Sequence, residues 1–300
     1  MTIARTPYVD LPGALVDELV LAGLDPEDVY RMVVRAFDED LPDGGHDVTS
    51  SAMPPMGHGT GDIAAREAGV VAGLGVAELV LVYALGSALV VGDRVADGSR
   101  VDAGDVVMTV SGPLQDLLTA ERTALNFASH LSGVATATSH WVAALEGTHA
   151  RVLDTRKTLP TYRSLQKYAV RCGGGVNHRF SLSDRAMVKD NHVVAAGGVV
   201  PAYELVRAAN PELRVEVEVT DLDQLRQLLE VGCTEILLDN MDTATMAEAV
   251  AITSGRATLE ASGGLTLERA REVAETGVDF ISVGALTHSV KVFDLGLDLR

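Results

Sequence analysis

The 300-residue sequence has few cysteines, few aromatic residues and a shortage of positive charge. Only Cys172 and Cys233 are present, which excludes a disulfide framework and favours a reducing compartment. Lysine and arginine number 24 against 42 aspartates and glutamates, so the formal net charge is −18. Because a negative field of this size repels phosphates, we expect neither nucleic acid nor an anionic membrane as a partner.

Long hydrophobic runs are also missing. The most apolar stretch, residues 70–91, contains Glu78 and is interrupted by glycines, whereas a membrane-spanning helix needs about 20 apolar residues in a row. The first 20 residues lack a basic stretch followed by an apolar segment, so no export signal is expected. The hydrophobic share of 47% still supports a sizeable buried core. The sequence therefore predicts a soluble, cytoplasmic protein.

From about residue 150 to residue 286, one pattern repeats: a short apolar strand that ends in a polar residue, followed by a helix. We expect strands at residues 151–154, 186–189, 215–218, 236–239, 258–261 and 280–283. Such alternation predicts a parallel sheet with helices outside it. The segment is about half as long as the ~250 residues of an eight-stranded barrel, and the dinucleotide-binding glycine motif is absent. We therefore predict an α/β barrel that lacks one or two strands, rather than an open doubly wound sheet.

The character of the chain changes near Pro113. Short β-branched runs separated by turns occupy residues 87–112, and a long helical pattern follows over residues 114–145. We expect an N-terminal α/β domain over residues 1–115 and a barrel domain over residues 116–286, with the tail 287–300 packing back on the first domain.

The scarce basic residues are concentrated between Arg151 and Asn191. This stretch of 41 residues has a net charge of +6, which leaves −24 for the rest of the chain. Arg156, Lys157 and Lys189 lie at expected strand ends, where barrel enzymes keep their sites. A solvated charged surface would also explain such a cluster. Its position nevertheless favours a site for a substrate with several negative groups, because arginine and lysine bind carboxylates and phosphates.

Acidic residues and glycines also occur at strand ends. Glu218 and Asp239 end two successive strands and could pair with basic side chains, bind Mg²⁺ or stabilise a developing cation. Two glycine-containing loops, residues 262–264 and 283–285, follow the last two strands. Such glycines serve in plain turns, but barrels commonly bind phosphate at these loops, so we expect a phosphate site here.

A series of motifs from about residue 38 to the C-terminus closely resembles the quinolinate phosphoribosyltransferases, also called carboxylating nicotinate-nucleotide pyrophosphorylases. The motifs are TAERTALN (119–126), HLSGVAT (130–136), DTRKTLP (154–160), KYAVRCGGGVNHR (167–179), KDNH (189–192), EVEV (216–219), LLDN (237–240) and VGALTH (283–288). The resemblance implies an N-terminal α/β sandwich followed by an incomplete α/β barrel of about seven elements. It also implies that quinolinate and phosphoribosyl pyrophosphate react with Mg²⁺ to give nicotinate mononucleotide, pyrophosphate and CO₂ in NAD biosynthesis.

The resemblance further implies roles for individual residues. The residues expected around the quinolinate carboxylates and the pyrophosphate are Thr155, Arg156, Lys157, His178, Arg179 and Lys189. The expected catalytic residues are Lys157 and Lys189, which shape the surroundings of the departing carboxylate, and Glu218 and Asp239, which bind ribose hydroxyls or Mg²⁺. The residues expected at the 5′-phosphate are Ser262, Gly263, Gly264, Val283, Gly284 and Ala285. Arg122 is expected to reach the site of a neighbouring subunit, which implies a homodimer and leaves a hexamer built from dimers open.

The sequence departs from the family motifs at two positions, and three alternative functions remain open. His46 and Ser181 stand where the family commonly has glycine, and Ser181 lies close to Arg179 in the sequence. A relative associated with molybdenum uptake would bind another ligand, although the DTRK and NHR motifs argue against it. A lyase that uses Lys189 as a Schiff-base nucleophile is a second alternative, and a non-catalytic assembly protein is a third.

Overall fold

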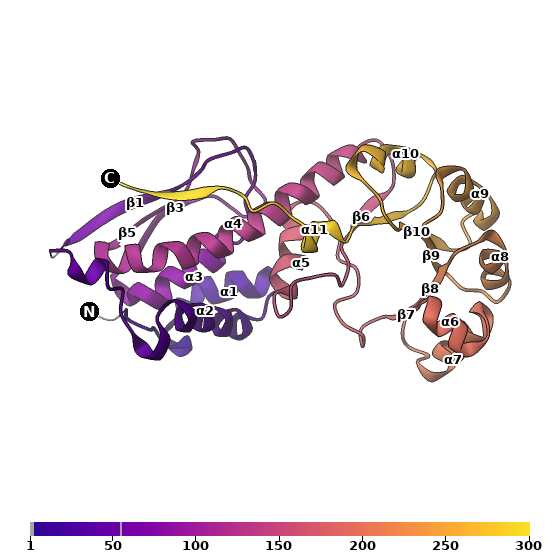
Figure 1. Cartoon of the computed structure of the whole chain (residues 1–300), viewed down its shortest axis with the longest axis horizontal. Coiled ribbons are helices and arrows are strands. Elements are labelled where there is room, and N and C mark those ends of the chain that lie inside the picture. The colour runs from indigo at the N-terminus through magenta and orange to yellow at the C-terminus, as the bar shows by residue number, and fades with distance from the viewer. Residues whose placement is uncertain (1–2, 55) are drawn as a thin grey trace. The chain divides into compact units, whose positions relative to one another are not determined.

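The computed structural model describes residues 3–54 and 56–300, and the chain forms two compact units (Figure 1). The first unit contains the residues up to Ala137 together with Ser164–Gly173 and Val290–Arg300. The second contains Thr138–Arg163 and Gly174–Ser289. Helix α4 (Leu114–Ala144) begins in the first unit and ends in the second. The boundary expected at residue 115 falls at the start of α4, whereas the compact units divide this helix near Ala137.

A four-stranded antiparallel sheet forms the centre of the first unit, in the order β12-β1-β5-β3, and a separate pair joins β2 to β4. The strands are β1 (His58–Ala65), β2 (Gly69–Val70), β3 (Val90–Arg94), β4 (Arg100–Val101), β5 (Val106–Pro113) and β12 (Leu295–Leu299). Strand β12 pairs with β1, with Leu297 opposite Ile63, so the C-terminal segment returns to this unit.

The other helices of the first unit are α1 (Gly13–Leu21), α2 (Pro26–Asp40), α3 (Leu74–Leu85) and, apart from its first residue, α5 (Arg163–Cys172). Helix α2 begins where the Asp25 carboxylate caps the free N–H groups and Pro26 occupies the first turn. Its buried residues Val29, Val33 and Phe37 lie four positions apart and form one apolar face. Among the described residues, no helix has both the length and the apolar character that a membrane span requires.

Six parallel strands form the sheet of the second unit, in the order β6-β11-β10-β9-β8-β7. They are β6 (Arg151–Leu153), β7 (Ala186–Val188), β8 (Val215–Val219), β9 (Glu235–Asp239), β10 (Thr258–Ser262) and β11 (Phe280–Ser282). Each differs from its predicted range by no more than one residue at an end, so the predicted succession of βα units is confirmed. The helices between and after them are α6 (Asp190–Ala196), α7 (Val199–Ala209), α8 (Leu222–Glu230), α9 (Thr243–Thr253), α10 (Ala270–Glu275) and α11 (Ala285–His288). Figure 1 shows α8, α9 and α10 on the outer side of the curved sheet.

The barrel of the second unit is incomplete, as expected. Val176 forms an isolated parallel bridge with Leu153 of β6, which extends the sheet to a seventh position. Within the described part of the chain, no ladder connects Val176 to β7. The intervening residues 177–185 therefore occupy the open side of the barrel without the hydrogen bonds of a strand.

The inner face of this sheet carries charged side chains. Leu237 of β9 and Glu260 of β10 line a cavity on the inner face, and Glu218 of β8 lies opposite Leu237 in the strand register. Since residues two positions apart share a face, Glu216 also points inward. Barrel interiors are usually filled by branched aliphatic side chains. The glutamates here show that the interior serves another purpose besides packing.

Candidate active site

A cavity of about 290 Å³ lies at the carboxyl ends of the parallel strands of the second unit. Its lining residues come from several strand ends and the loops that follow them: Thr155, Arg156, Lys157, His178, Arg179, Met187, Lys189, Leu237, Glu260, Ser262 and Ser282. The carboxyl ends of barrel strands are where barrel enzymes bind substrate. Seven of the lining residues were expected in the site from the sequence.

The other expected site residues lie outside the cavity lining. Glu218 accepts a hydrogen bond from the Lys189 ammonium over 3.0 Å, and Asp239 lies opposite Ser262 in the sheet register. The cavity-lining Lys157 packs over Gly284, since a Cβ atom at this glycine would lie 2.9 Å from the Lys157 Cδ. The positions of Gly263, Gly264, Val283 and Ala285 follow from the chain, because they adjoin Ser262 and Gly284. Arg122 is exposed on α4 in the first unit.

The loop after β6 presents cationic side chains through local hydrogen bonds. The Thr155 hydroxyl accepts the backbone N–H of Lys157 over 3.0 Å, and the Thr287 hydroxyl of α11 donates to the Lys157 carbonyl over 2.8 Å. The Nε atom of Arg156 is buried and has no hydrogen-bond partner among the described residues. A buried guanidinium donor that lacks a partner is suited to an anionic ligand.

The two arginines of the cavity repel each other. Burial lowers the pKa of the Arg179 guanidinium below its usual value, and the like charge of Arg156 lowers it further. Two guanidinium groups that disfavour each other's charge become more stable when an anion lies between them. The cavity is therefore built for a substrate with negative groups.

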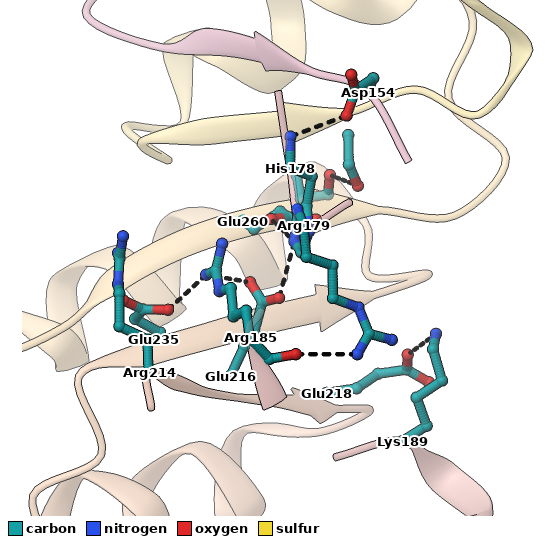
Figure 2. Close-up of polar contacts among 12 residues, drawn as sticks. Asp154, His178, Arg179, Arg185, Lys189, Arg214, Glu216, Glu218, Glu235 and Glu260 are labelled. Atoms are coloured by element: carbon teal, nitrogen blue, oxygen red, sulfur yellow. Dashed lines mark hydrogen bonds and ion pairs between the residues drawn. The ribbon is translucent and has the colours of Figure 1, made fainter. Parts of the chain in front are cut away.

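His178 lies between two buried glutamates (Figure 2). Its Nε2 atom is 2.9 Å from Oε2 of Glu216 on β8 and 3.3 Å from Oε2 of Glu260 on β10. Burial by itself lowers the pKa of His178, but its hydrogen bonds with Glu216 and Glu260 outweigh burial and raise the pKa to about 9. Burial raises the pKa of Glu260. Burial also acts to raise the pKa of Glu216, but the hydrogen bond with His178 and the positive charges of His178 and Arg185 outweigh it and lower that pKa. We therefore assign a cationic His178 paired with an ionised Glu216.

The backbone N–H of Arg179 lies 2.7 Å from Nδ1 of His178, a hydrogen bond that only a neutral ring accepts. Charge balance around Nε2 favours the cation, because a buried carboxylate is costly without a positive partner. The Arg179 N–H therefore opposes protonation of Nδ1, whereas the two glutamates at Nε2 favour the cationic ring. The backbone N–H of His178 is held separately by Oδ1 of Asp154 over 2.8 Å.

Two carboxylates at neighbouring strand ends offer oxygen ligands for a divalent cation. One oxygen of Glu218 accepts from Lys189, and one oxygen of Asp239 accepts from the Asn240 side chain over 2.8 Å. In the described part of the chain, the second oxygen of each carboxylate accepts no hydrogen bond. Carboxylate oxygens with this freedom suit Mg²⁺, which is commonly bound by one or two carboxylates together with substrate phosphates.

Three acidic residues in and beneath the cavity were not predicted from the sequence. Glu216, Glu235 and Glu260 are buried on the inner face of the sheet, and Arg185 forms ion pairs with two of them. One signal was available, since strands that are buried on both faces are normally continuous hydrophobic runs. A glutamate in the interior of such a strand, as in β8 and β10, indicates a buried partner of opposite charge.

Ser181 does not line the cavity. Its backbone N–H and its hydroxyl both donate to the Asp184 carboxylate, over 3.1 and 3.3 Å, so the residue belongs to a turn in the segment 177–185. Its effect on the carboxylate pocket would therefore act through the shape of that segment.

Comparisons with known proteins agree with the motifs. Two family models match the chain: quinolinate phosphoribosyl transferase, N-terminal domain, over residues 47–132, and C-terminal domain, over residues 134–298. The nicotinate-nucleotide pyrophosphorylase (carboxylating) of Mycobacterium leprae is 52% identical over 270 residues, which cover 88% of this chain and 95% of that protein. A probable nicotinate-nucleotide pyrophosphorylase (carboxylating) of Bacillus subtilis is 43% identical over 204 residues, 68% of this chain and 71% of that protein. The structure of the nicotinate-nucleotide pyrophosphorylase from Francisella tularensis matches with a TM-score of 0.87 at 37% identity, over 91% of this chain and 96% of that one.

Proposed function

This chain belongs to the quinolinate phosphoribosyltransferase family, and we infer that it carries out the reaction of that family in the basic cavity of the second unit. It transfers the phosphoribosyl group of phosphoribosyl pyrophosphate to quinolinate and releases CO₂, which yields nicotinate mononucleotide and pyrophosphate for NAD biosynthesis. The observation that carries this assignment to the cavity is the convergence of Arg156, Lys157, Arg179 and Lys189 on one space, in a chain of net charge −18.

The chemistry has two stages. The ring nitrogen of quinolinate attacks the anomeric carbon while the bond to pyrophosphate breaks, and positive charge develops on the sugar and then on the ring. The bond to the adjacent carboxylate breaks next, its electron pair moves toward the pyridinium, CO₂ leaves and a proton replaces it. Fixed positive charges favour the departure of pyrophosphate, because they stabilise its anionic oxygens. The second stage is driven by the pyridinium, which accepts the electron pair as neutral CO₂ leaves.

We assign the cations of the cavity to the anionic groups of the two substrates. Arg156, His178 and Arg179 bind the quinolinate carboxylates, while Lys157 and Lys189 set the electrostatic surroundings of the carboxylate that leaves and of the pyrophosphate. The 5′-phosphate is assigned to the loops 262–264 and 283–285. Support comes from the cavity lining, from the unpartnered Nε of Arg156 and from the packing of Lys157 over Gly284.

We assign Mg²⁺ and the ribose to Glu218 and Asp239. When bound there, Mg²⁺ would neutralise the charge that develops on the departing pyrophosphate. The two carboxylates also stabilise oxocarbenium character at the anomeric carbon, because they add negative charge near a developing cation. The free carboxylate oxygens of both residues support this assignment.

A homodimer is the assembly we propose, with Arg122 of each chain completing the site of the other. The support is the match of Arg122 to the family motif at 119–126 and its exposure on α4. A cytoplasmic location is proposed from Cys172 and Cys233, which are both free thiols.

A Schiff-base lyase reaction at Lys189 fits the geometry less well. The Lys189 ammonium is paired with Glu218 over 3.0 Å, and a paired ammonium has no electron pair with which to attack a carbonyl. Borohydride treatment in the presence of a carbonyl substrate should therefore leave no covalent adduct at Lys189.

The test of the proposed function is direct. Incubation with quinolinate, phosphoribosyl pyrophosphate and Mg²⁺ should release CO₂ and nicotinate mononucleotide in equal amounts, and chelation of Mg²⁺ should stop the reaction. Arg156→Ala and Lys189→Ala should each lower kcat/KM by at least about a thousandfold, because each removes a charge that no neighbour replaces. Circular dichroism and the melting temperature check that the variants fold. Absence of both products with the native protein would refute the function, and near-native rates in either variant would refute the site.

A further inference from the structure

A chain of ion pairs crosses the interior of the barrel and ends at the cavity (Figure 2). Arg214 pairs with Glu235, and Oε2 of Glu235 lies 2.5 Å from Nη2 of Arg185. The same nitrogen of Arg185 lies 3.3 Å from Oε1 of Glu216, whose Oε2 lies 2.9 Å from Nε2 of His178. Glu216 thus links the Arg185 guanidinium to the His178 ring.

These buried charges are expensive for the fold. Glu216 is 1% exposed and Glu235 is 6% exposed, and removal of an ion from water costs several kcal/mol even when a partner is present. Aliphatic residues of similar volume would fill the same space at lower cost. The retention of charge at these positions points to a role outside stability.

The segment that needs support is residues 177–185, on the open side of the barrel. It carries His178 and Arg179 into the cavity, yet no strand ladder within the described ranges holds it. Side-chain contacts fix it instead. The carboxylate of Asp154 accepts the backbone N–H of His178 over 2.8 Å, and the Arg185 carbonyl accepts from Nη1 of Arg179 over 3.1 Å.

Arg185 therefore has two functions in this segment. Its guanidinium is anchored by Glu216 and Glu235, and its carbonyl orients the guanidinium of Arg179. Displacement of the Arg185 side chain would disturb Arg179, and displacement of Glu216 would disturb both Arg185 and His178. Two cavity cations thus depend on one carboxylate that does not line the cavity.

We propose that Glu216 is a positioning residue that sets the affinity of the cavity for the two carboxylates of quinolinate, through His178 on one oxygen and through Arg185 and Arg179 on the other. This role rests on the proposed function. The groups assigned to phosphoribosyl pyrophosphate are Lys157, Lys189, Glu218, Asp239 and the loops after β10 and β11. Among the described residues, none of them forms a hydrogen bond or ion pair with the Glu216 side chain, which contacts His178 and Arg185 instead. Loss of Glu216 should therefore affect the two substrates unequally.

The variant Glu216→Gln tests this inequality. Glutamine retains an acceptor for the His178 N–H but presents no second carboxylate oxygen to Arg185. We expect the KM for quinolinate and its dissociation constant from calorimetry to rise about tenfold to hundredfold, as for loss of a charged hydrogen bond. The KM for phosphoribosyl pyrophosphate should stay within about threefold of native. Glu216→Ala should be more severe, because it removes both contacts.

Glu248→Gln is the matched control, since it makes the same chemical change at an exposed position of helix α9, where Glu248 pairs with Arg226 and with no other described residue. It should leave both KM values and the melting temperature unchanged. Equal rises of both KM values in Glu216→Gln would overturn the proposal, because they would indicate a general disturbance of β8. An unchanged affinity for quinolinate would overturn it as well, while the native rate would still support the proposed function.

Arg185→Gln provides a second test should Glu216→Gln fail to fold. It removes the guanidinium that Glu216 anchors but leaves the Glu216–His178 contact in place. The same selective rise in the KM for quinolinate, of at least about fivefold, is expected. If Arg185→Gln binds quinolinate with native affinity, the link from Glu216 to Arg179 is refuted.

Discussion

The turn after β10 requires glycine at residue 263. Its φ is +98°, and a Cβ atom there would lie 2.2 Å from Oδ1 of Asn240. Asn240 itself has a φ of +54°, and its side-chain amide donates to Oδ2 of Asp239 over 2.8 Å. The orientation of the Asp239 carboxylate thus depends on how closely the two turns approach each other.

Gly263→Ala is expected to damage both stability and catalysis. The free energy of unfolding should fall by about 2–4 kcal/mol, from strain at positive φ and from the clash with Asn240. The kcat should fall at least about tenfold, because Asp239 loses its oriented partner.

Gly104→Ala is the control, since Gly104 has the same φ of +98° but open space at its Cβ position. It should lose only about 1 kcal/mol and no activity. Urea unfolding and steady-state rates decide the comparison, and equal losses in the two variants would contradict it.

His178 should make both stability and quinolinate binding sensitive to alkaline pH. Its pKa rises from the ordinary 6.5 to about 9 in the folded protein. The stabilisation by the charged ring is therefore complete below about pH 6.5 and is lost as the pH rises through about 9. It amounts to on the order of 3 kcal/mol. The kcat/KM for quinolinate should fall over the same range, because the cavity loses a cation. In His178→Gln, the pH profiles of stability and of kcat/KM should both lack this loss near pH 9. A loss of native size in that variant would show that another group titrates there.

Among the secondary-structure elements, the short helix α11 supports the loop that carries Lys157. The Thr287 hydroxyl donates to the Lys157 carbonyl over 2.8 Å, and Thr287 is only 1% exposed. Gly284, which precedes α11, lets the Lys157 side chain pack against it. Helix and loop therefore position one cation of the cavity together.

Thr287→Val should remove this hydrogen bond to Lys157 while it keeps the shape of the side chain. It leaves the Lys157 carbonyl without its donor, so we expect a loss of about 1–2 kcal/mol in stability and about a tenfold fall in kcat/KM. Thr287→Ser keeps the hydroxyl and removes a methyl group, and it should retain most of the activity. If Thr287→Val keeps its activity and Thr287→Ser loses it, packing of the methyl group, and not the hydrogen bond, positions Lys157.

For the whole molecule, the acidic net charge and the basic cavity serve different ends. The net charge of −18 favours solubility, whereas the stretch 151–191, which is net positive, supplies the cations of the cavity. Because basic residues are concentrated in the stretch that supplies the cavity while the rest of the chain is acidic, a protein of negative net charge can bind two anionic substrates.

The proposed sharing of each site between two subunits predicts complementation. Arg122→Ala and Lys189→Ala should each be inactive alone, because every site lacks one residue. After the two variants are mixed and their subunits exchange, half of the dimers contain one copy of each, and one of the two sites in such a dimer is intact. The mixture should recover about a quarter of the native activity. Mixing native protein with Glu248→Gln controls for losses during exchange, and absence of any recovery would contradict a site that includes Arg122 of the partner.

Much of the fold and of the candidate site could be predicted from the sequence, because the patterns that indicate them are local. The period of the βα units predicted all six strands of the barrel to within one residue at each end, since strand and helix patterns depend on near neighbours. The same local reading placed Arg156, Lys157 and Lys189 at strand ends, and the cavity contains all three. It placed Glu218 and Asp239 correctly at strand ends, although neither lines the cavity.

The sequence by itself determined the succession of elements, the charge distribution and the family motifs. Only the tertiary structure decided what lies beneath the cavity, namely the contacts of His178 with Glu216 and Glu260 and of Arg185 with Glu235. These residues are distant in the chain and become neighbours only through the strand order β10-β9-β8-β7 and the open side of the barrel. Local periodicity carries no information on which inward-facing side chains meet, because sheet order and closure depend on the packing of the whole unit.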